Sequence, residues 1–369
     1  SNNYQNLELS NKNLSFRSGT LHLAGGATVS AAPTLEHGAT ITLLVSGTDN
    51  HWTKDATITS AQGVSSITLE EGAELTVDEV LKADGSGTYQ YSPFYANANT
   101  DFSITVGQNA TLTSGNLWGW VTGAAATTSH PITIEEGGTW HITGLKEGAL
   151  FLNQTSIRLQ GGTIRLDDGT KFHSERANNS IETLADATRG SLITGGSINL
   201  NNRPLTITTN KWQGNDGSAA DLLIESTITG GQSLTKAGDG TLRLPGSNTN
   251  TGAVNISAGT LVSASESALG TGAVNIASGA TLALENNLTI AGALDLKDGA
   301  TVAWLDDAIL NLTGTVTVGG KLSIDLSGIT TEGSSTLLTF ATAPTGLDLA
   351  GIDVTYADGY SGSLSLNGN

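Results

Sequence analysis

The sequence predicts an all-β protein in which short parallel strands stack coil on coil as a β-solenoid. The pentapeptide Gly-Ala-Val-Asn-Ile occupies residues 252–256 and returns at 272–276, so the step is about 20 residues. Such a fixed period indicates a solenoid, because one small unit cannot bury its apolar side chains without stacked neighbours. Within the repeated units every second residue is apolar, which is typical of strands. The 47 glycines help to supply the tight corners that each coil needs.

The N-terminal part of the chain shows the same alternation in degenerate form. Glycines separate short alternating strands that we predict near residues 7–9, 14–16, 20–23 and 40–43. Farther along, residues 67–75 and 132–140 each combine a strand, a Glu-Glu-Gly corner and a second strand. The two stretches therefore represent the same edge of two coils.

Three insertions interrupt the β-helix, which we assign to residues 1–327. They lie near residues 80–103, 115–131 and 171–190. Residues 181–187 within the third insertion contain no glycine and are the one segment whose sequence permits a helix.

The 20-residue repeat becomes irregular after Leu326, and strands are expected within residues 335–342 and 352–356. A solenoid needs a terminal cover, because open strand edges recruit other chains. We therefore predict that residues 328–369 form a C-terminal cap or the end of the solenoid.

Residues 234–270 also carry a family resemblance. The motifs read LTKAGDGTL at 234–242, GSNTNTG at 246–252, AGTL at 258–261 and ALG at 268–270. They resemble the autotransporter-associated β-strand repeat, which occurs in secreted passenger domains and other large surface proteins of Gram-negative bacteria. The chain departs from that pattern at Pro245 and Asn250, where the family usually has Ser and an aromatic residue.

The resemblance implies a right-handed parallel β-helix with loop insertions. It also implies a location at the cell surface, anchored to the outer membrane, or secretion from a Gram-negative bacterium. It implies no enzymatic activity, because the repeat is a scaffold.

The amino-acid composition limits the kinds of partner that the chain can bind. The net charge is −18, with 16 Lys and Arg against 34 Asp and Glu. Binding of nucleic acid requires a basic face that neutralises the phosphates, so we do not expect nucleic acid as a partner. The chain has no Cys, so it forms no disulfide and no thiolate metal site. No stretch approaches the roughly 20 apolar residues of a membrane span. We expect no membrane insertion by this fragment, and any anchor to lie outside it.

A polysaccharide-degrading enzyme, a lyase or a hydrolase, is the main alternative, because several such enzymes share the parallel β-helix. Paired carboxylates occur at Asp167-Asp168 and at Asp306-Asp307, and such pairs can act as acid and base across a glycosidic bond. However, the first pair precedes Gly169 and fits a turn, and the second follows a strand end. We predict no catalytic residue, metal or cofactor, and favour a protein that is not an enzyme.

Two sets of side chains are candidates for ligand binding. The first is aromatic and lies in two consecutive insertions: Tyr89, Tyr91, Tyr95, Trp118 and Trp120. Solvent-facing rings stack on sugars and anchor protein interfaces, although these rings could instead form a small satellite core. The second set is basic: Arg158, Arg165, Lys171, Arg176 and Arg189. Stacked coils could align these cations for an anionic glycan, or spread them over several solvated faces.

The function that the sequence favours is adhesion or scaffolding at a bacterial surface. The loops would contact host or matrix glycans, glycoproteins or neighbouring cells, and the chain could also associate with itself. A structural spacer without a ligand of its own is a third alternative.

Overall fold

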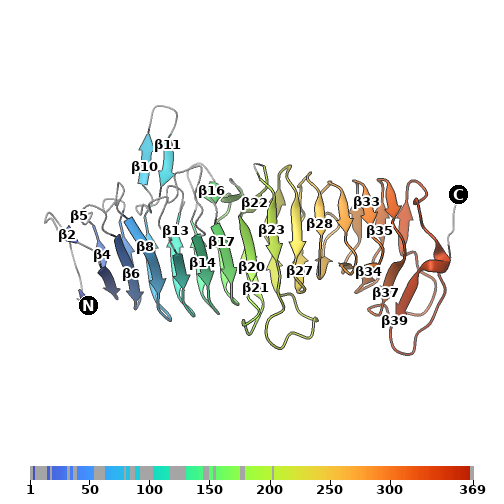
Figure 1. Cartoon of the computed structure of the whole chain (residues 1–369), viewed down its shortest axis with the longest axis horizontal. Coiled ribbons are helices and arrows are strands. Elements are labelled where there is room, and N and C mark those ends of the chain that lie inside the picture. Colours follow the sequence, from blue (N-terminus) through green and yellow to red (C-terminus); the bar gives the residue numbers. More distant parts are fainter. Residues whose placement is uncertain are drawn as a thin grey trace. The chain divides into compact units, whose positions relative to one another are not determined.

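In the residues that it describes, the structure, a computed structural model, is all-β apart from one short 3₁₀ helix (Figure 1). It describes residues 3–4, 15–16, 19–30, 34–35, 40–53, 63–78, 80–83, 88–91, 103–115, 130–143, 149–152, 155–174, 179–201 and 203–365. The chain divides into two compact units, and each is described by itself. Unit 1 comprises residues 1–199 and 212–214, and unit 2 comprises residues 200–211 and 215–369.

Unit 1 contains three sheets of parallel strands. The first sheet has the order β1 (Asn3–Tyr4), β3 (Gly19–Ala24), β6 (Thr40–Ser46), β8 (Gly63–Leu69), β12 (Ser103–Val106), β14 (His130–Ile134), β17 (Thr155–Leu159) and β20 (Ser180–Thr183). The second has the order β4 (Thr28–Val29), β7 (Asn50–Trp52), β9 (Glu74–Val77), β13 (Thr111–Ser114), β15 (Thr139–Ile142), β18 (Thr163–Leu166) and β21 (Ser191–Thr194). The third has the order β16 (Ala149–Leu152), β19 (Lys171–Ser174) and β22 (Ser197–Asn199).

Two smaller elements complete unit 1. The strands β2 (Ser15–Phe16) and β5 (Thr34–Leu35) form a parallel pair. The strands β10 (Val80–Ala83) and β11 (Thr88–Tyr91) form an antiparallel hairpin, in contrast to the parallel coils (Figure 1).

Unit 2 repeats the three-sheet plan. Its first sheet has the order β23 (Leu205–Thr208), β26 (Leu234–Ala237), β28 (Val254–Ile256), β30 (Val274–Ile276), β33 (Leu294–Leu296) and β36 (Val316–Val318). The second has the order β24 (Leu222–Ile224), β27 (Thr241–Leu244), β29 (Thr260–Ser263), β31 (Thr281–Leu284), β34 (Ala300–Trp304), β37 (Leu322–Leu326) and β39 (Asp353–Tyr356). The third contains β32 (Leu288–Ile290), β35 (Leu310–Leu312) and β38 (Leu338–Phe340).

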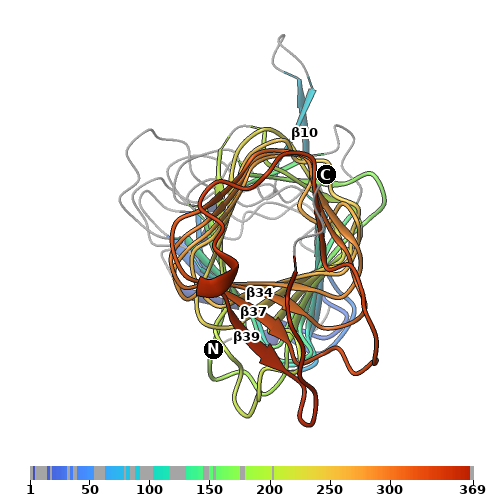
Figure 2. The ribbon, with the colours of Figure 1, turned by 90° about the vertical axis from the view of Figure 1, so that its right-hand side faces the viewer.

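A further strand, β25 (Thr227–Thr229), and the 3₁₀ helix η2 (Leu349–Gly351) also belong to unit 2. Figure 2 looks along the coils and shows β34, β37 and β39 of the second sheet one behind another.

The predicted fold class and register are confirmed. Val254 pairs with Val274 and Ile256 pairs with Ile276, so the repeated pentapeptides lie in register on adjacent coils. All four side chains are buried, because strand alternation sends every second residue into the core. The intervening Asn255 and Asn275 point the other way, and the amide nitrogen of Asn275 donates to the amide oxygen of Asn255 at 2.7 Å.

The two Glu-Glu-Gly corners also stack as predicted. β8 and β14 both pair with β12, while β9 and β15 both pair with β13, so the corners belong to equivalent positions of the coils. Gly72 and Gly137 have φ values of 67° and 70°, in the left-handed region that favours glycine. Asn109 occupies the corner between them with φ 55°.

Some segment predictions are wrong, and others remain untested. Residues 181–187 are not helical: β20 covers Ser180–Thr183 and pairs with β17 of the adjacent coil. β19 likewise pairs with β16, so this part of the predicted third insertion forms coil strands. Residues 116–129, which make up most of the second predicted insertion, lie outside the described residues.

The predicted C-terminal strands are present as β38 and β39. They pair in parallel with β35 and β37, so this part of the chain continues two sheets of unit 2. A capping role for residues 328–369 remains a prediction.

A column of glycines sets how closely the coils of unit 2 approach one another. A Cβ on Gly272 would overlap the carbonyl oxygen of Gly252, and one on Gly292 would overlap that of Gly272. A Cβ on Gly314 would likewise overlap the carbonyl oxygen of Gly292. These overlaps are with backbone, which cannot rotate away, so each position in the column requires glycine.

We expect Gly272→Ala to destabilise the protein by about 3 kcal/mol, because the added methyl group must displace the backbone of the adjacent coil. Gly279→Ala is the matched control. Gly279 has φ 73°, but a Cβ there would have no atom within 4 Å, so only a conformational cost of about 1–2 kcal/mol is expected. Urea unfolding followed by tryptophan fluorescence measures both changes. Equal losses for the two variants would contradict the close approach at Gly272.

Candidate functional site

The aromatic candidates belong to parts of unit 1 that the structure describes least. Tyr89 and Tyr91 lie on β11, where their backbone pairs with Lys82 and Val80 of β10. Tyr95, Trp118 and Trp120 lie outside the described residues. The aromatic site therefore remains a prediction.

The basic candidates are spread over several faces of unit 1. Arg158 lies on the first sheet, Arg165 on the second and Lys171 on the third. Arg189 packs over Gly161 at a corner, and Arg176 lies outside the described residues. The four described side chains are exposed, but they do not form the single stripe that a linear anionic glycan would require.

Arg165 is part of a cluster on the second sheet of unit 1 that the sequence did not reveal. His141 Nε2 lies 2.8 Å from Asp167 Oδ1, and Arg165 Nη2 lies 2.8 Å from His141 Nδ1. A second His–Asp pair repeats this arrangement, with His51 Nε2 at 2.8 Å from Asp78 Oδ1. In both pairs the histidine lies on one strand, and the aspartate comes directly after the strand that pairs with it on the next coil. The two side chains meet only because the coils are in register.

The two carboxylate pairs lie in turns. The backbone oxygen of Asp167 accepts a hydrogen bond from Thr170 N, and Gly169 has φ 80°, as the turn interpretation predicts. Asp307 N donates to Asp306 Oδ1 at 2.7 Å, and the hydroxyl of Thr331 lies 3.2 Å from both carboxylate oxygens of Asp307.

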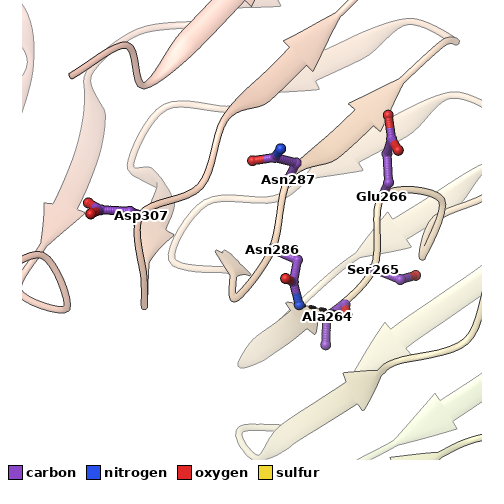
Figure 3. A pocket seen from close by; sticks show the side chains of 6 residues that line it. All are labelled: Ala264, Ser265, Glu266, Asn286, Asn287 and Asp307. Atoms are coloured by element: carbon purple, nitrogen blue, oxygen red, sulfur yellow. Dashed lines mark hydrogen bonds between the residues drawn. The ribbon is translucent and has the colours of Figure 1, made fainter.

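A polar hollow of 440 Å³ lies on unit 2 (Figure 3). Its lining comes from the corners that follow β29, β31 and β34 on successive coils: Ala264, Ser265, Glu266, Asn286, Asn287 and Asp307. Asn287 lies between Glu266 and Asp307, whose carboxylates stand at opposite ends of the row (Figure 3). This row presents hydrogen-bond acceptors to solvent.

Several lining side chains of the hollow bind neighbouring coils. Asn286 Nδ2 donates to Ala264 O at 2.9 Å, and Asn287 Oδ1 accepts from Ile309 N at 2.8 Å. These contacts give the hollow a structural role. Among the described residues, no group of three or more His, Asp or Glu side chains is placed to hold a metal ion.

The most unusual ionisable group of unit 2 is Lys236, on β26. Its side chain is fully buried, and its Nζ donates to three carbonyl oxygens, those of Ala237 at 3.0 Å and of Gly238 and Ala258 at 2.9 Å. Two of these oxygens belong to its own turn and one to the next coil, so the ammonium group ties the two together. Asn250, also buried, ties coils in the same way, since its Nδ2 donates to Leu269 O at 3.2 Å.

Burial lowers the pKa of Lys236 to about 8, because the charged form loses its hydration; the carboxylates of Asp221 and Asp239 oppose this shift. The lysine belongs to the LTKAGDGTL motif. Strand residues alternate between the two sides, so Lys236 points to the same buried side as Leu234.

Comparison with known proteins identifies this region. Residues 234–262 match the model of the Passenger-associated-transport-repeat. A stretch of 224 residues, 56% of the chain, is 30% identical to the protein named Adhesin BmaC autotransporter of Brucella suis biovar 1 (strain 1330). The chain spans only 6% of the length of that relative. No solved structure matches the chain significantly.

The repeat, the similarity to an autotransporter adhesin and the stacked parallel coils all fit one class of protein. The chain resembles a passenger-type β-helix, and its match to the autotransporter-associated repeat covers residues 234–262. Both matches indicate a surface or secreted protein of a Gram-negative bacterium. Within the part of the chain that the structure describes, no helix is long and apolar enough to cross a membrane.

We expect the stability of unit 2 to rise between pH 8 and pH 10 because of Lys236. The unfolded chain holds this proton up to its ordinary pKa of about 10.5, whereas burial lowers the pKa in the folded chain to about 8. The unfolded state therefore binds more protons in this window, and the free energy of unfolding increases with pH by roughly 2 kcal/mol.

Lys236→Met should abolish this rise, while Lys297→Met, which removes an exposed lysine, should retain it. Urea unfolding at several pH values gives the difference between each variant and the parent. A rise of the same size in Lys236→Met would show that another group is responsible.

Proposed function

We propose that this chain is a segment of an adhesive passenger, a β-helix that presents binding loops at the bacterial cell surface. The observation that carries the proposal is the 30% identity to an autotransporter adhesin over more than half of the chain. The parallel coils support it, because a rigid scaffold with paired backbone groups can hold loops in place without taking part in binding.

The connections between coils of unit 1 support a binding role for the first two predicted insertions. One connection leaves β9 after Val77 and returns at β12, while the next leaves β13 after Ser114 and returns at β14. Val77 pairs with Ser114, and Ile104 pairs with Ile132, so both connections depart from and return to neighbouring positions. Two insertions at the same corner of adjacent coils are well placed to build one joint surface.

Aromatic side chains are the contacts that we assign to this surface. Binding energy concentrates in a few anchors, and aromatic rings stack on sugar faces. The net charge of −18 disfavours an anionic partner at long range. The ligand class we propose is a neutral glycan or glycoprotein of a host, a matrix or a neighbouring cell.

Replacing Trp118 and Trp120 together by Ala should weaken ligand binding by about 2 kcal/mol, roughly 30-fold, while the coils remain folded. A glycan array and immobilised matrix glycoproteins would identify a ligand for the purified chain, and surface plasmon resonance would measure the loss. Tyr360→Ala is the matched control, because Tyr360 is an exposed aromatic residue outside both insertions.

Circular dichroism separates the two ways in which the experiment can fail. A folded double mutant with unchanged affinity would refute the aromatic contact. Loss of the fold would show that these rings form a satellite core. If the parent chain bound no glycan or glycoprotein at all, the adhesive function would be refuted for this segment.

A further inference from the structure

Some asparagines of the chain stand in the sequence Asn-X-Ser/Thr, whose side-chain amide accepts N-linked sugars in secreted proteins. In the described part of the chain this sequence begins at Asn109, Asn255, Asn287 and Asn311. The residue X is buried in each case, while the flanking Asn and Ser or Thr are at least partly exposed. The four amides differ in the contacts that they already make with neighbouring coils.

Neighbouring coils occupy the amides of Asn109, Asn255 and Asn311. Asn255 Nδ2 lies 3.5 Å from Thr235 Oγ1. Asn311 is half-buried on β35, between β32 and β38 of the third sheet. Asn109 packs against Gly137, where a Cβ would lie only 2.2 Å from Asn109 Oδ1. A sugar on any of these asparagines would disturb a contact between coils.

Asn287 is different, because the fold uses only its oxygen. It is exposed and lies at the corner directly before β32. Its Oδ1 accepts a hydrogen bond from Ile309 N of the next coil at 2.8 Å, whereas its Nδ2 has no hydrogen-bond partner among the described residues. N-glycosylation replaces one hydrogen of Nδ2 and leaves Oδ1 in place. The contact with Ile309 therefore survives the modification.

The polar hollow provides room beside Asn287. Its volume of 440 Å³ falls within the range of pockets that hold small ligands. Asn287 stands between Glu266 and Asp307, whose carboxylate oxygens can accept hydrogen bonds from sugar hydroxyls (Figure 3). The hydroxyl of Thr289, the third residue of the sequence, lies 3.3 Å from Glu266 Oε1 on the same side. A sugar joined to Asn287 therefore meets open space and acceptors rather than a packed coil.

We propose that Asn287 carries an N-linked sugar, added by a glycosyltransferase of the producing bacterium from a phosphate-activated sugar. In this transfer Nδ2 forms a bond to the anomeric carbon of the sugar, and the bond from that carbon to the phosphate oxygen breaks. The phosphate leaves with the bonding electron pair, and Nδ2 loses one hydrogen as a proton. The proposal is independent of adhesion, because the modification requires no ligand to be bound.

Mass spectrometry of the protein isolated from the bacterium that produces it tests the modification. We expect the peptide that contains Asn287 to carry the added mass of at least one sugar residue. The same chain, expressed in cells without a glycosyltransferase for this sequence, should lack the added mass. Fragmentation of the peptide distinguishes Asn287 from the adjacent Asn286, which is also exposed but is followed by Leu288 where a Ser or Thr is required.

Variants at Thr289 test whether the sequence directs the transfer. Thr289→Ala should remove the added mass and Thr289→Ser should retain it, because the second residue after the acceptor must carry a hydroxyl group. Both variants keep Asn287 and its bond to Ile309. Asn286→Gln is the matched control at the adjacent amide and should also retain the sugar. Circular dichroism of each purified variant checks that the coils are folded.

The proposal fails if the peptide is found only without a sugar, if the sugar persists in Thr289→Ala, or if the sugar is attached to Asn286. It also fails if sugars occupy Asn255 or Asn311 and leave Asn287 unmodified, because a free and exposed Nδ2 would then not determine the site.

Discussion

The structure depends on one constraint: the backbone of each coil pairs in parallel, and in register, with the backbone of the next. Parallel strands lie about 4.8 Å apart, so side chains at the same position of successive coils are forced into contact. Trp140, for example, lies between Leu112 and Ile164, and its Nε1 donates to Ser114 of the adjacent coil at 2.9 Å. The same spacing leaves no room for a Cβ at Gly272. A residue is therefore acceptable when it fits the equivalent residues of the coils before and after it.

This constraint explains what could be predicted from the sequence and what could not. The repeat at 252–256 and 272–276 gave the register directly, because identical residues stack on one another. Residues 181–187, whose sequence permits a helix, form no helix because pairing with β17 decided the local structure, and local propensity did not. The basic set remains a prediction, but its described members are separated for a related reason. Arg158 and Arg165 are close in sequence, but a corner separates them, and each lies on a different sheet.

The contacts that sequence reasoning missed are those between coils. His141 and Asp167 are 26 positions apart and meet only because β15 and β18 are neighbours. Lys236 was visible as part of a motif, but its role was not, because the three carbonyl groups that bind it belong to a turn and to the next coil. A buried ammonium group is costly unless polar partners surround it. In this scaffold the carbonyl oxygens of a glycine-containing corner are those partners.

The two units differ at the strand positions that alternate with the core-facing residues. On the second sheet of unit 1 these positions carry Thr76, Thr113, His141 and Arg165 in one column. The second sheet of unit 2 carries Val262, Ala283 and Ala303 at the corresponding positions of its strands, where they form a buried cluster. The backbone geometry is common to both, so it cannot account for the difference. The residues at these positions are thus chosen separately from the backbone geometry of the coils: in unit 1 they are polar and at least partly exposed, and in unit 2 they are apolar and buried.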